Sequence, residues 1–583
     1  MSRRRYNAEQ IADMLTNIPS DEEIPSEDDA SVDERDNIEM NDYPQSDEFE
    51  MESPSEQSSE SCDDDDDDND IVCGRNGFQW SRKSPHRASF RQQNIVRESL
   101  GLAPPVRDLE SVDDFFRYVI DYRLIRDILF NTNKRLPHDA MELVENEIYA
   151  YIGLLLLFGL SKKCDVEIQE IWKKDSVHFL PLAVLTMSRN RFLQINRHIT
   201  FDDIDSRNER KVNDPKCYKI REMMTHFRDK IRQAIVPSEE LCVDETLYAF
   251  RGKCSVRQYM PNKPNKYGLK YWTIVDGKTG YALDTTLYAG KEQPGNRRNM
   301  NVGENVVLEL CRPYFRTGRG VTVDNFFTSI PLANRLWQEG MTLTGTLRQN
   351  KVEIPASCLT KNRDLYSSEF LFAGPLTLCS YACKPKKMVV LLSTEHHTST
   401  IDSNDKKTPK IIEAYNDYKG GVDALDWRIE KYTCRRKTAR WTLNVFFYLL
   451  DVAAANAVVL SKLVFVLKNE PRNLSPRYRK DALEKLARSL LQPCIDDRIS
   501  KWQVSRQGIP RELQHLAMSL GFLSSTPGGA HGQLQVPRNS SGRCHLCPRS
   551  LDRKTRMNCV FCVRFCCKEH CSQLCEDCKQ SFE

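Results

Sequence analysis

Four aspartates in three separate segments are the residues of this chain best suited to metal-dependent chemistry. Asp244 and Asp324 each follow a short apolar, β-branched run, so we expect each carboxylate at or near the end of a buried strand. Asp423 and Asp426 follow a glycine pair, and their i, i+3 spacing places both on one face near the start of a helix. Because buried carboxylates need a partner, such a group is typical of a site for two Mg²⁺ ions in phosphodiester chemistry.

The sequence around these aspartates is more specific than their spacing, since any single aspartate has the ordinary alternative of a helix cap or a salt bridge. The strings VDETLYAFRGKC, VDNFFTSIPLANRL, GTLRQNK and YNDYKGGVDALD, followed by RKTARW, closely resemble the blocks of piggyBac-type transposases, in the same order. The resemblance covers roughly residues 95–510 and resumes in the cysteine-rich tail. It implies a DDD transposase in which Asp244, Asp324, Asp423 and Asp426 are catalytic and hold two Mg²⁺ ions per active site.

Hydropathy patterning and this resemblance together predict an α/β chain with an RNase H-like catalytic core. A β-rich insertion interrupts the core, an all-α dimerisation and DNA-binding domain is split on either side of it, and a small zinc-binding cross-brace domain ends the chain. The expected segments are a disordered acidic region (1–95), helical domain (96–238), core (239–349), insertion (350–409), core (410–432), helical domain (433–511), linker (512–540) and cysteine-rich domain (541–583).

Charge is distributed very unevenly along the chain. Residues 1–72 carry 26 acidic and 4 basic residues, a net charge of −22, whereas the remainder carries 80 basic and 56 acidic residues, a net of +24. The acidic head has few apolar residues, so we expect it to be disordered. The basic remainder suits a polyanionic partner such as DNA. The head either competes with DNA for this basic surface or is only a solubilising tail.

The chain is expected to be a soluble, nuclear protein. No apolar segment follows the opening MSRRR, which argues against a secretory signal. The apolar stretch at 148–160 is too short to cross a bilayer, and the one at 441–467 contains Asn444, Asp451, Asn456 and Lys462. Buried helices of a globular core explain both stretches better than membrane spans.

Nine of the 21 cysteines lie in residues 541–583, where clustered soft ligands indicate zinc rather than disulfides. The spacing predicts two zinc ions per chain, with either crossed or sequential pairing of the ligand pairs. The resemblance to the piggyBac tail supports crossed pairing, and Cys566 is an alternative to Cys567. The predicted sites are Cys544, Cys547, Cys567 and His570 for the first ion, and Cys559, Cys562, Cys575 and Cys578 for the second.

Further DNA contacts are implied by the resemblance, each with a structural alternative. Arg348 and Lys351 match basic positions near the catalytic site, and the alternative is ordinary surface solvation. Arg440 and Trp441 are also predicted to contact DNA, because Trp441 matches an aromatic residue that stacks on an unpaired base, although it is equally suited to the core of the following helix. Asn325 and Ser329 lie beside a metal ligand, where Asn325 could equally cap a turn or helix.

The function implied by the resemblance is binding of transposon terminal inverted repeats by a homodimer. The ends would be cut through hairpin intermediates and inserted at TTAA sites in double-stranded DNA. The main alternative is a domesticated, transposase-derived host protein that binds DNA without transposing it. A RING-type ubiquitin ligase is disfavoured, because the only ligand histidine closes the third ligand pair rather than standing in the order typical of RING domains.

The acidic head leads to a first prediction. If it competes with DNA for the basic body, deletion of residues 1–72 should tighten non-specific DNA binding, and the gain should shrink as salt screens the charges. Binding titrations of full-length and truncated protein over a range of ionic strengths measure the effect. Equal affinity at low salt would leave the head as a solubilising tail.

Overall fold

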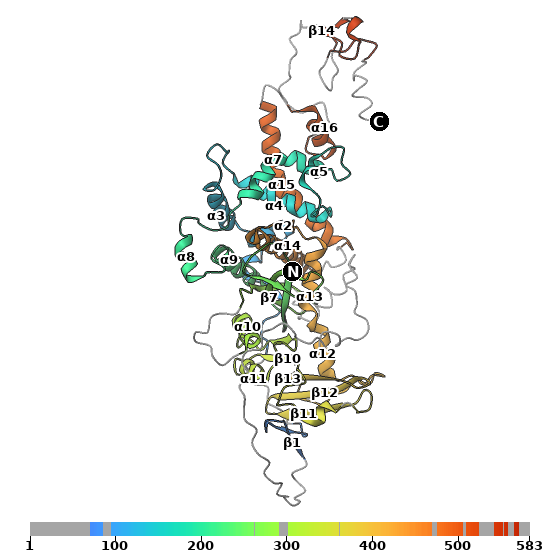
Figure 1. The fold of residues 1–583 in the computed structure, drawn as a ribbon. Helices are drawn as coiled ribbons and strands as arrows, with labels where there is room; N and C mark the ends of the chain where they lie inside the picture. Colours follow the sequence, from blue (N-terminus) through green and yellow to red (C-terminus); the bar gives the residue numbers. More distant parts are fainter. Residues whose placement is uncertain are drawn as a thin grey trace, which may run out of the picture. The chain divides into compact units, whose positions relative to one another are not determined.

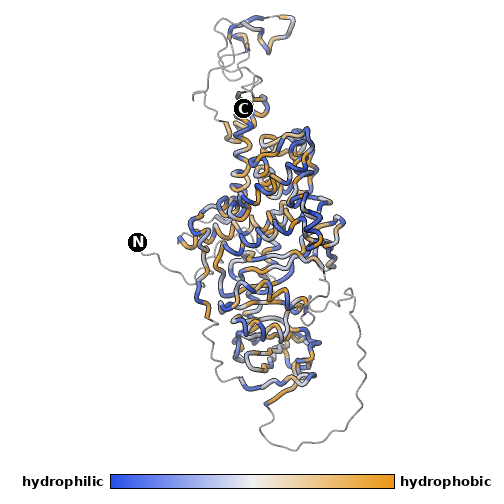
Figure 2. The backbone as a smooth tube through the Cα atoms, turned by 90° about the vertical axis from the view of Figure 1, so that its left-hand side faces the viewer, coloured by the Kyte–Doolittle hydropathy of each residue, from blue (hydrophilic) through white to orange (hydrophobic). Residues whose placement is uncertain are grey.

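A computed structural model of the full-length chain describes residues 70–84, 95–261, 263–290, 301–360, 362–468, 475–504, 509–523, 541–551, 553–557 and 565–570. The chain divides into two compact units, residues 1–516 and residues 517–583. The first unit contains a large mixed β-sheet and most of the helices (Figure 1). Apolar and polar stretches alternate along this unit, as expected where each element buries one face (Figure 2).

The central sheet of the first unit has eleven strands in the order β1-β2-β11-β12-β13-β10-β9-β5-β7-β6, with β8 pairing β7. Its strands are β1 (Ile71–Cys73), β2 (Gln79–Ser81), β5 (Glu240–Ala249), β6 (Arg257–Tyr259), β7 (Tyr267–Asp276), β8 (Ala282–Leu287), β9 (Gly320–Val323), β10 (Thr342–Thr346), β11 (Ser368–Ala373), β12 (Leu376–Lys384) and β13 (Lys387–Ser393). A separate short pair joins β3 (Gly101–Leu102) to β4 (Ile235–Val236).

In the middle of this sheet two neighbouring strand pairings are parallel, and the pairings on either side of them are antiparallel. β9 runs parallel to both β5 and β10, with Val323 opposite Val243 and Gly345. β7 runs antiparallel to β5 and to β8. The apolar strands β9 and β10 are buried throughout, as expected for parallel strands covered on both faces.

The segment predicted as an insertion, 350–409, is continuous with this sheet. Its expected strand KMVVLLS is confirmed as β13, which pairs antiparallel with β10 through Thr344 and Ser393. Cys379 and Val389 of this segment pack in one apolar cluster with Ile411 and Tyr415 of α12 (Lys410–Lys419). The sheet edge therefore extends outward from the core instead of ending at it.

The expectation of disorder over residues 1–95 is wrong for residues 70–84, which form a β-hairpin. β2 adds this hairpin to the sheet by pairing with β11, and Trp80 is almost completely buried. Trp80, which is buried, and Val72, which is half-buried, supply what the acidic head lacks, apolar side chains that pack. Residues 1–69 and 85–94 lie outside the described residues. Because β1 begins at Ile71, a deletion of 1–69 separates the acidic head from this hairpin.

Helices that precede the sheet strands in the sequence pack against helices that follow them. α14 contacts α2, and α15 contacts α2 and α4, so segments on both sides of the core meet as predicted. The helices are α2 (Val112–Val119), α3 (Tyr122–Asn133), α4 (Glu145–Leu160), α5 (Ile168–Trp172), α6 (Pro181–Thr186), α7 (Arg189–His198), α8 (Arg207–Asn213), α9 (Arg221–Arg232), α10 (Val302–Cys311), α11 (Ile330–Gln338), α13 (Gly421–Lys431), α14 (Trp441–Leu467), α15 (Tyr478–Val504) and α16 (Arg511–Ser519).

α14 is the one helix of the described chain long and apolar enough to span a membrane by composition, but 89% of its most apolar window is buried inside the protein. Its polar residues are tied to the sheet. The Asn456 side chain bonds both backbone groups of Ala282 in β8, at 2.8 and 2.9 Å. Asp451 accepts hydrogen bonds from the Tyr248 hydroxyl at 2.7 Å and from the Cys434 amide at 2.9 Å. These bonds satisfy polar groups that would otherwise be costly to bury.

Gly159, near the end of α4, leads to a second prediction. An added Cβ there would lie 2.4 Å from the Tyr432 carbonyl oxygen and 2.6 Å from that of Thr433, both backbone atoms that cannot rotate away. Glycine to alanine normally stabilises a helix, but here overpacking should lower the free energy of unfolding by about 1–3 kcal/mol. Chemical denaturation measures this change, and Gly101→Ala, where nothing lies closer than 3.9 Å, is the matched control. An unchanged or raised stability for Gly159→Ala would contradict the packing.

Candidate functional site

The pairing of β5 with β9 brings the first two aspartates next to each other. The parallel register ends at Val243 in β5 and Val323 in β9, so Asp244 and Asp324 are the next residues on these two neighbouring segments. Asp324 directly follows β9, as predicted. Asp244 differs from the prediction, because β5 continues to Ala249 alongside β7 and leaves the carboxylate in the middle of the strand. Because β9 ends at Val323, β5 has no β9 partner beyond Val243, and Asp244 still lies beside the end of a strand.

The other two aspartates approach from α13, whose start at Gly421 agrees with the predicted helix. Gly421 lets the helix lie close on the sheet, since an added Cβ would come within 3.1 Å of the Cys242 Cβ in β5. Asp423 lies in the first turn, where the amide dipoles favour negative charge, and Asp426 lies one turn further along. The Thr246 hydroxyl of β5 donates to Asp426 Oδ1 at 2.7 Å and fixes the helix to the strand.

Gathering these carboxylates in a half-buried site makes their ionisation unfavourable. Burial, together with Glu245 and Asp324, raises the pKa of Asp244 well above its ordinary value. Burial and then Glu245 raise the pKa of Asp324 to about 7, against amide donors and Arg348. Burial raises the pKa of Asp426 to about 7, although Lys263 and Thr246 act against it. Burial and carboxylate–carboxylate repulsion therefore both disfavour the charged form of these side chains.

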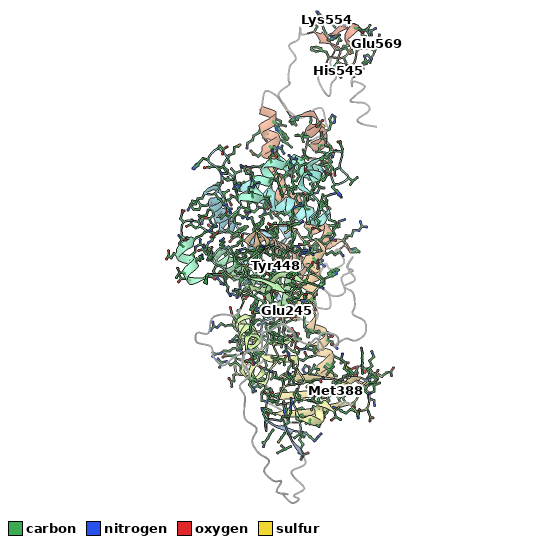
Figure 3. All side chains as sticks on the ribbon, viewed as in Figure 1. Glu245, Met388, Tyr448, His545, Lys554 and Glu569 are labelled. Carbon is green, nitrogen blue, oxygen red and sulfur yellow. The ribbon has the colours of Figure 1, made fainter. Side chains whose placement is uncertain are left out.

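Three residues of this site were not singled out from the sequence. Glu245 adds a carboxylate beside Asp244, on the opposite face of β5, and lies near the middle of the unit (Figure 3). The Lys263 ammonium lies 3.9 Å from Asp423 Oδ1 and 3.3 Å from the Glu245 carbonyl oxygen. Burial lowers its pKa, but the surrounding carboxylates outweigh burial and raise it. Lys263 follows the quoted string VDETLYAFRGKC in the sequence, yet only its neighbours in space reveal its role.

Lys270 is the third of these residues and the most buried. Lys270 is only 7% exposed. Its Nζ lies 3.9 Å from the centre of the Trp272 ring and 5.5 Å from that of Phe326. Burial lowers its pKa, against the attraction of Glu245, Asp244 and Asp324. The two aromatic rings thus hold a cation beside the carboxylates without a direct ion pair to any described residue.

The donor chemistry of the site fits Mg²⁺, which prefers carboxylate oxygens. Asp244, Asp324, Asp423 and Asp426 would hold it, and a bound cation would offset the burial and mutual repulsion that raise the pKa values of Asp244, Asp324 and Asp426. The carboxylates are not preassembled at ligand distances. In the part of the chain that the structure describes, only a cysteine–histidine group brings three or more ligand atoms within 4.8 Å of one another.

The residues predicted to contact DNA near Asp324 have different settings. Arg348 is half-buried and its Nε donates to Asn325 Oδ1 at 3.2 Å, so these two predicted residues lie together beside Asp324. Lys351 is half-buried on the loop that follows. Ser329 is buried and is the N-cap of α11, where its hydroxyl accepts from the Leu332 amide and donates to Glu304. That cap is a structural role, so direct contact of Ser329 with DNA would require the cap to open.

Arg440 and Trp441 begin α14. The Arg440 guanidinium donates to the carbonyl oxygens of Asn196, Arg197 and Ile199 at the end of α7, and burial lowers its pKa. Its charge therefore compensates a helix C-terminus, a use that the sequence pattern did not indicate. Trp441 is half-buried, whereas the helix core begins at Leu443. Part of its ring is therefore available to stack on a base, as the prediction requires.

In the second unit, the structure brings together all four ligands predicted for the first zinc ion. Ligand atoms of Cys544, Cys547, Cys567 and His570 lie within 4.8 Å of one another. The His570 Nδ1 lies 3.4 Å from Cys547 Sγ and 3.3 Å from Cys567 Sγ. Three thiols and an imidazole suit tetrahedral Zn²⁺. The ligands come from the first and third pairs, as crossed pairing requires, and the second predicted set lies outside the described residues.

The thiols of this group titrate unequally. Burial raises the pKa of Cys544, but hydrogen bonds from backbone amides and His570 outweigh burial and bring it to about 6. Burial and the neighbouring thiols raise the pKa of Cys547 to about 11. Cys566, the alternative ligand, is fully buried with its Sγ 3.3 Å from His545 Nδ1, outside the group. This placement favours Cys567 as the ligand.

Comparison with known proteins agrees with this mixed α/β fold. A family model described as transposase IS4 matches residues 112–458. A solved structure of a piggyBac transposase synaptic complex with hairpin DNA is similar to this chain, with a TM-score of 0.71 and 30% identity, covering 82% of this chain and 100% of that chain. The chain therefore belongs to the transposase IS4 family, of the piggyBac type.

Relatives in human are more distant. PiggyBac transposable element-derived protein 3 of Homo sapiens is 23% identical over 342 residues, which cover 55% of this chain and 56% of that protein. PiggyBac transposable element-derived protein 2 of Homo sapiens is 22% identical over 385 residues, covering 62% and 64%. The chain spans just over half to about two thirds of the length of these relatives, so their whole-protein activities do not transfer to it directly.

The cysteine cluster gives a third prediction. Cys567→Ser removes a ligand of the group, so purified full-length protein should lose at least one zinc ion per chain relative to the parent. Cys566→Ser is the neighbouring control and should keep the parent zinc content, because its thiol lies outside the group. Elemental analysis of the three proteins decides the question. Unchanged zinc in Cys567→Ser, or an equal loss in both variants, would contradict the assigned ligands.

Proposed function

We propose that this chain is a DNA transposase whose catalytic centre is formed by Asp244, Asp324, Asp423 and Asp426. The observation that carries the proposal is that three chain segments bring the four aspartates to one region of the sheet. Parallel pairing of β5 and β9 aligns the first two aspartates, and α13, fixed through Thr246, brings the other two. Membership of a transposase family supports phosphoryl transfer on DNA as the use of such a carboxylate group.

The chemistry needs a divalent metal, held by the same four aspartates. When bound, Mg²⁺ supplies charge that activates the attacking oxygen and stabilises the leaving oxygen of a phosphodiester. Residues of the chain orient the carboxylates and reduce the repulsion between them. Thr246 orients Asp426, the Phe326 amide donates to Asp324 Oδ1 at 2.9 Å, and Lys263 and Lys270 limit the repulsion among the carboxylates.

The strand order supports an RNase H-like core. In the series β8-β7-β5-β9-β10 the first two steps are antiparallel and the last two are parallel. In this arrangement the first and fourth strands in chain order are neighbours, and both present aspartates at the point where their pairing ends. The core is then formed by residues 239–349 and 410–432, with the sheet extended by the segment between them.

We extend the proposal to the substrate and partners. The solved piggyBac transposase complex contains hairpin DNA, which supports double-stranded DNA with hairpin intermediates as substrate. Terminal inverted repeats, TTAA target sites, a homodimer and a nuclear location complete the proposal as the family resemblance implies them. Arg348, Asn325, Lys351 and Trp441 would contact the DNA, and two zinc ions would hold the tail.

A domesticated host protein that binds DNA without transposing it is the second candidate. The names of the human relatives, which describe them as derived from a transposable element, favour it. The retained set of four aspartates favours an active enzyme, because a DNA-binding role alone gives no reason to keep costly buried carboxylates together.

A fourth prediction separates these two functions. Asp324→Asn should lower nicking and strand transfer by roughly a thousand-fold or more, since a lost metal ligand removes several kcal/mol of transition-state stabilisation. Binding to end DNA should stay close to that of the parent. Asp417→Asn, on the exposed face of α12, is the matched control and should cleave normally. Cleavage assays with labelled end DNA and Mg²⁺ measure both variants, and full cleavage by Asp324→Asn would refute the catalytic assignment.

A further inference from the structure

The N-terminal hairpin (residues 70–84) docks on the loop at residues 350–353, which leads away from β10. β1 and β2 pair with each other from Ile71↔Ser81 to Cys73↔Gln79, and Ser81 continues the sheet by pairing with Phe372 of β11. β2 therefore lies between β1 and β11, and Figure 1 shows β1 at the edge of the sheet beyond β11. The hairpin thus reaches across about 270 residues of sequence to a loop close to the catalytic core.

Every carbonyl oxygen of the 350–353 loop accepts a hydrogen bond from this hairpin. The bonds run from Arg75 Nη2 to the Asn350 and Lys351 oxygens at 2.9 Å each, from the Asn76 amide to the Val352 oxygen at 3.4 Å, and from Trp80 Nε1 to the Glu353 oxygen at 2.8 Å. A loop whose consecutive carbonyls are all bonded by one partner has little freedom to rotate its peptide groups.

The fit between hairpin and loop is close as well as hydrogen-bonded. At Gly74, an added Cβ would lie 2.5 Å from the Glu353 carbonyl oxygen and 2.7 Å from its carbon, so only glycine allows this approach. Trp80 is 1% exposed, and its ring lies 5.1 Å from that of Phe78. Burial of Trp80 therefore anchors the hairpin at the point where its indole bonds the loop.

The other end of the loop reaches the catalytic centre. Arg348, two residues before it, donates to Asn325 and lowers the pKa of Asp324 against the effect of burial. Gln349 donates from Nε2 to the Met388 carbonyl oxygen at 2.7 Å, and the Lys351 amide donates to the Arg348 carbonyl oxygen at 3.1 Å. The sheet thus holds one side of this segment and the hairpin holds the other.

We propose that the N-terminal hairpin is a positioning element that sets Arg348 and Lys351 for phosphates of the bound DNA. The inference rests on the proposed function, in which these two side chains contact DNA. Carbonyl oxygens facing a phosphate would repel it, and Arg75 covers two of them while adding a positive charge of its own. Arg75 and Trp80 act through the loop and are positioning residues, not catalytic ones.

The test compares Arg75→Gln with Arg82→Gln in the full-length protein, as the fifth prediction. Both lie on the hairpin and both substitutions remove one charge, but Arg82 pairs with Glu369 and does not bond the loop. Arg75→Gln should weaken binding of end DNA by about five- to ten-fold, because it removes the Arg75 bonds to the Asn350 and Lys351 carbonyls and loosens Lys351. Arg82→Gln should weaken it by less than about two-fold. Trp80→Phe keeps the buried ring and loses the indole donor, so its weakening of end-DNA binding should lie between those of Arg75→Gln and Arg82→Gln.

Two further readouts distinguish positioning from a general loss of charge or fold. Hydrogen exchange at residues 350–354 should accelerate in Arg75→Gln and not in Arg82→Gln. In a Lys351→Ala background, adding Arg75→Gln should weaken binding of end DNA by less than about a further two-fold. The two residues act on the same contact, and the effects of coupled residues are not additive. Equal weakening by Arg75→Gln and Arg82→Gln, or an undiminished effect in the Lys351→Ala background, would overturn the inference.

Failure of the proposed function would leave a different pattern. If Arg348→Ala and Lys351→Ala both bind end DNA as tightly as the parent, the DNA contacts assigned to this loop are wrong. The hydrogen-exchange comparison would still report whether the hairpin holds the loop, because it needs no DNA. Loss of binding in Arg348→Ala and Lys351→Ala with parent-like binding in Arg75→Gln would instead overturn the positioning role alone.

Discussion

The parallel pairing of β5 with β9 is the constraint on which the candidate active site depends. It ends at Val243 and Val323 and so delivers Asp244 and Asp324 to the same edge from segments about 80 residues apart. α13 can add its two aspartates only because Gly421 allows the helix to lie against β5 and β7. A shift of one residue in the β5–β9 register would turn one carboxylate to the other face of the sheet.

Holding these carboxylates together is unfavourable in the absence of metal, and the surrounding structure offsets only part of the cost. Lys263 contributes a charge from the loop before β7, and Lys270 contributes one held against two aromatic rings. Burial first, and repulsion from neighbouring carboxylates second, raise the pKa values of Asp244, Asp324 and Asp426 despite these lysines. A site with an unmet need for positive charge is suited to bind divalent ions and phosphate-bearing DNA together.

Local pattern was enough to predict the elements that carry the aspartates, because strand and helix periodicity depend on neighbouring residues. The strand before Asp324, the helix start at Gly421 and the first cysteine–histidine group all agree with the sequence. Contacts between distant segments were not predictable in this way. Nothing near Arg440 indicates that it caps α7, and nothing near Trp80 indicates a hydrogen bond to a carbonyl 273 residues away. The N-terminal hairpin was hidden because strong acidic composition up to Asp70 outweighed the few apolar residues that follow.

The central claim is that the four aspartates form one metal centre, and counting bound metal tests it most directly. Mn²⁺, a paramagnetic substitute for Mg²⁺, can be titrated into full-length protein bound to end DNA and followed by electron paramagnetic resonance. The account predicts about two Mn²⁺ ions per chain, with binding weakened strongly by Asp244→Asn and unaffected by Asp417→Asn. Equal Mn²⁺ binding by the parent and Asp244→Asn would contradict it.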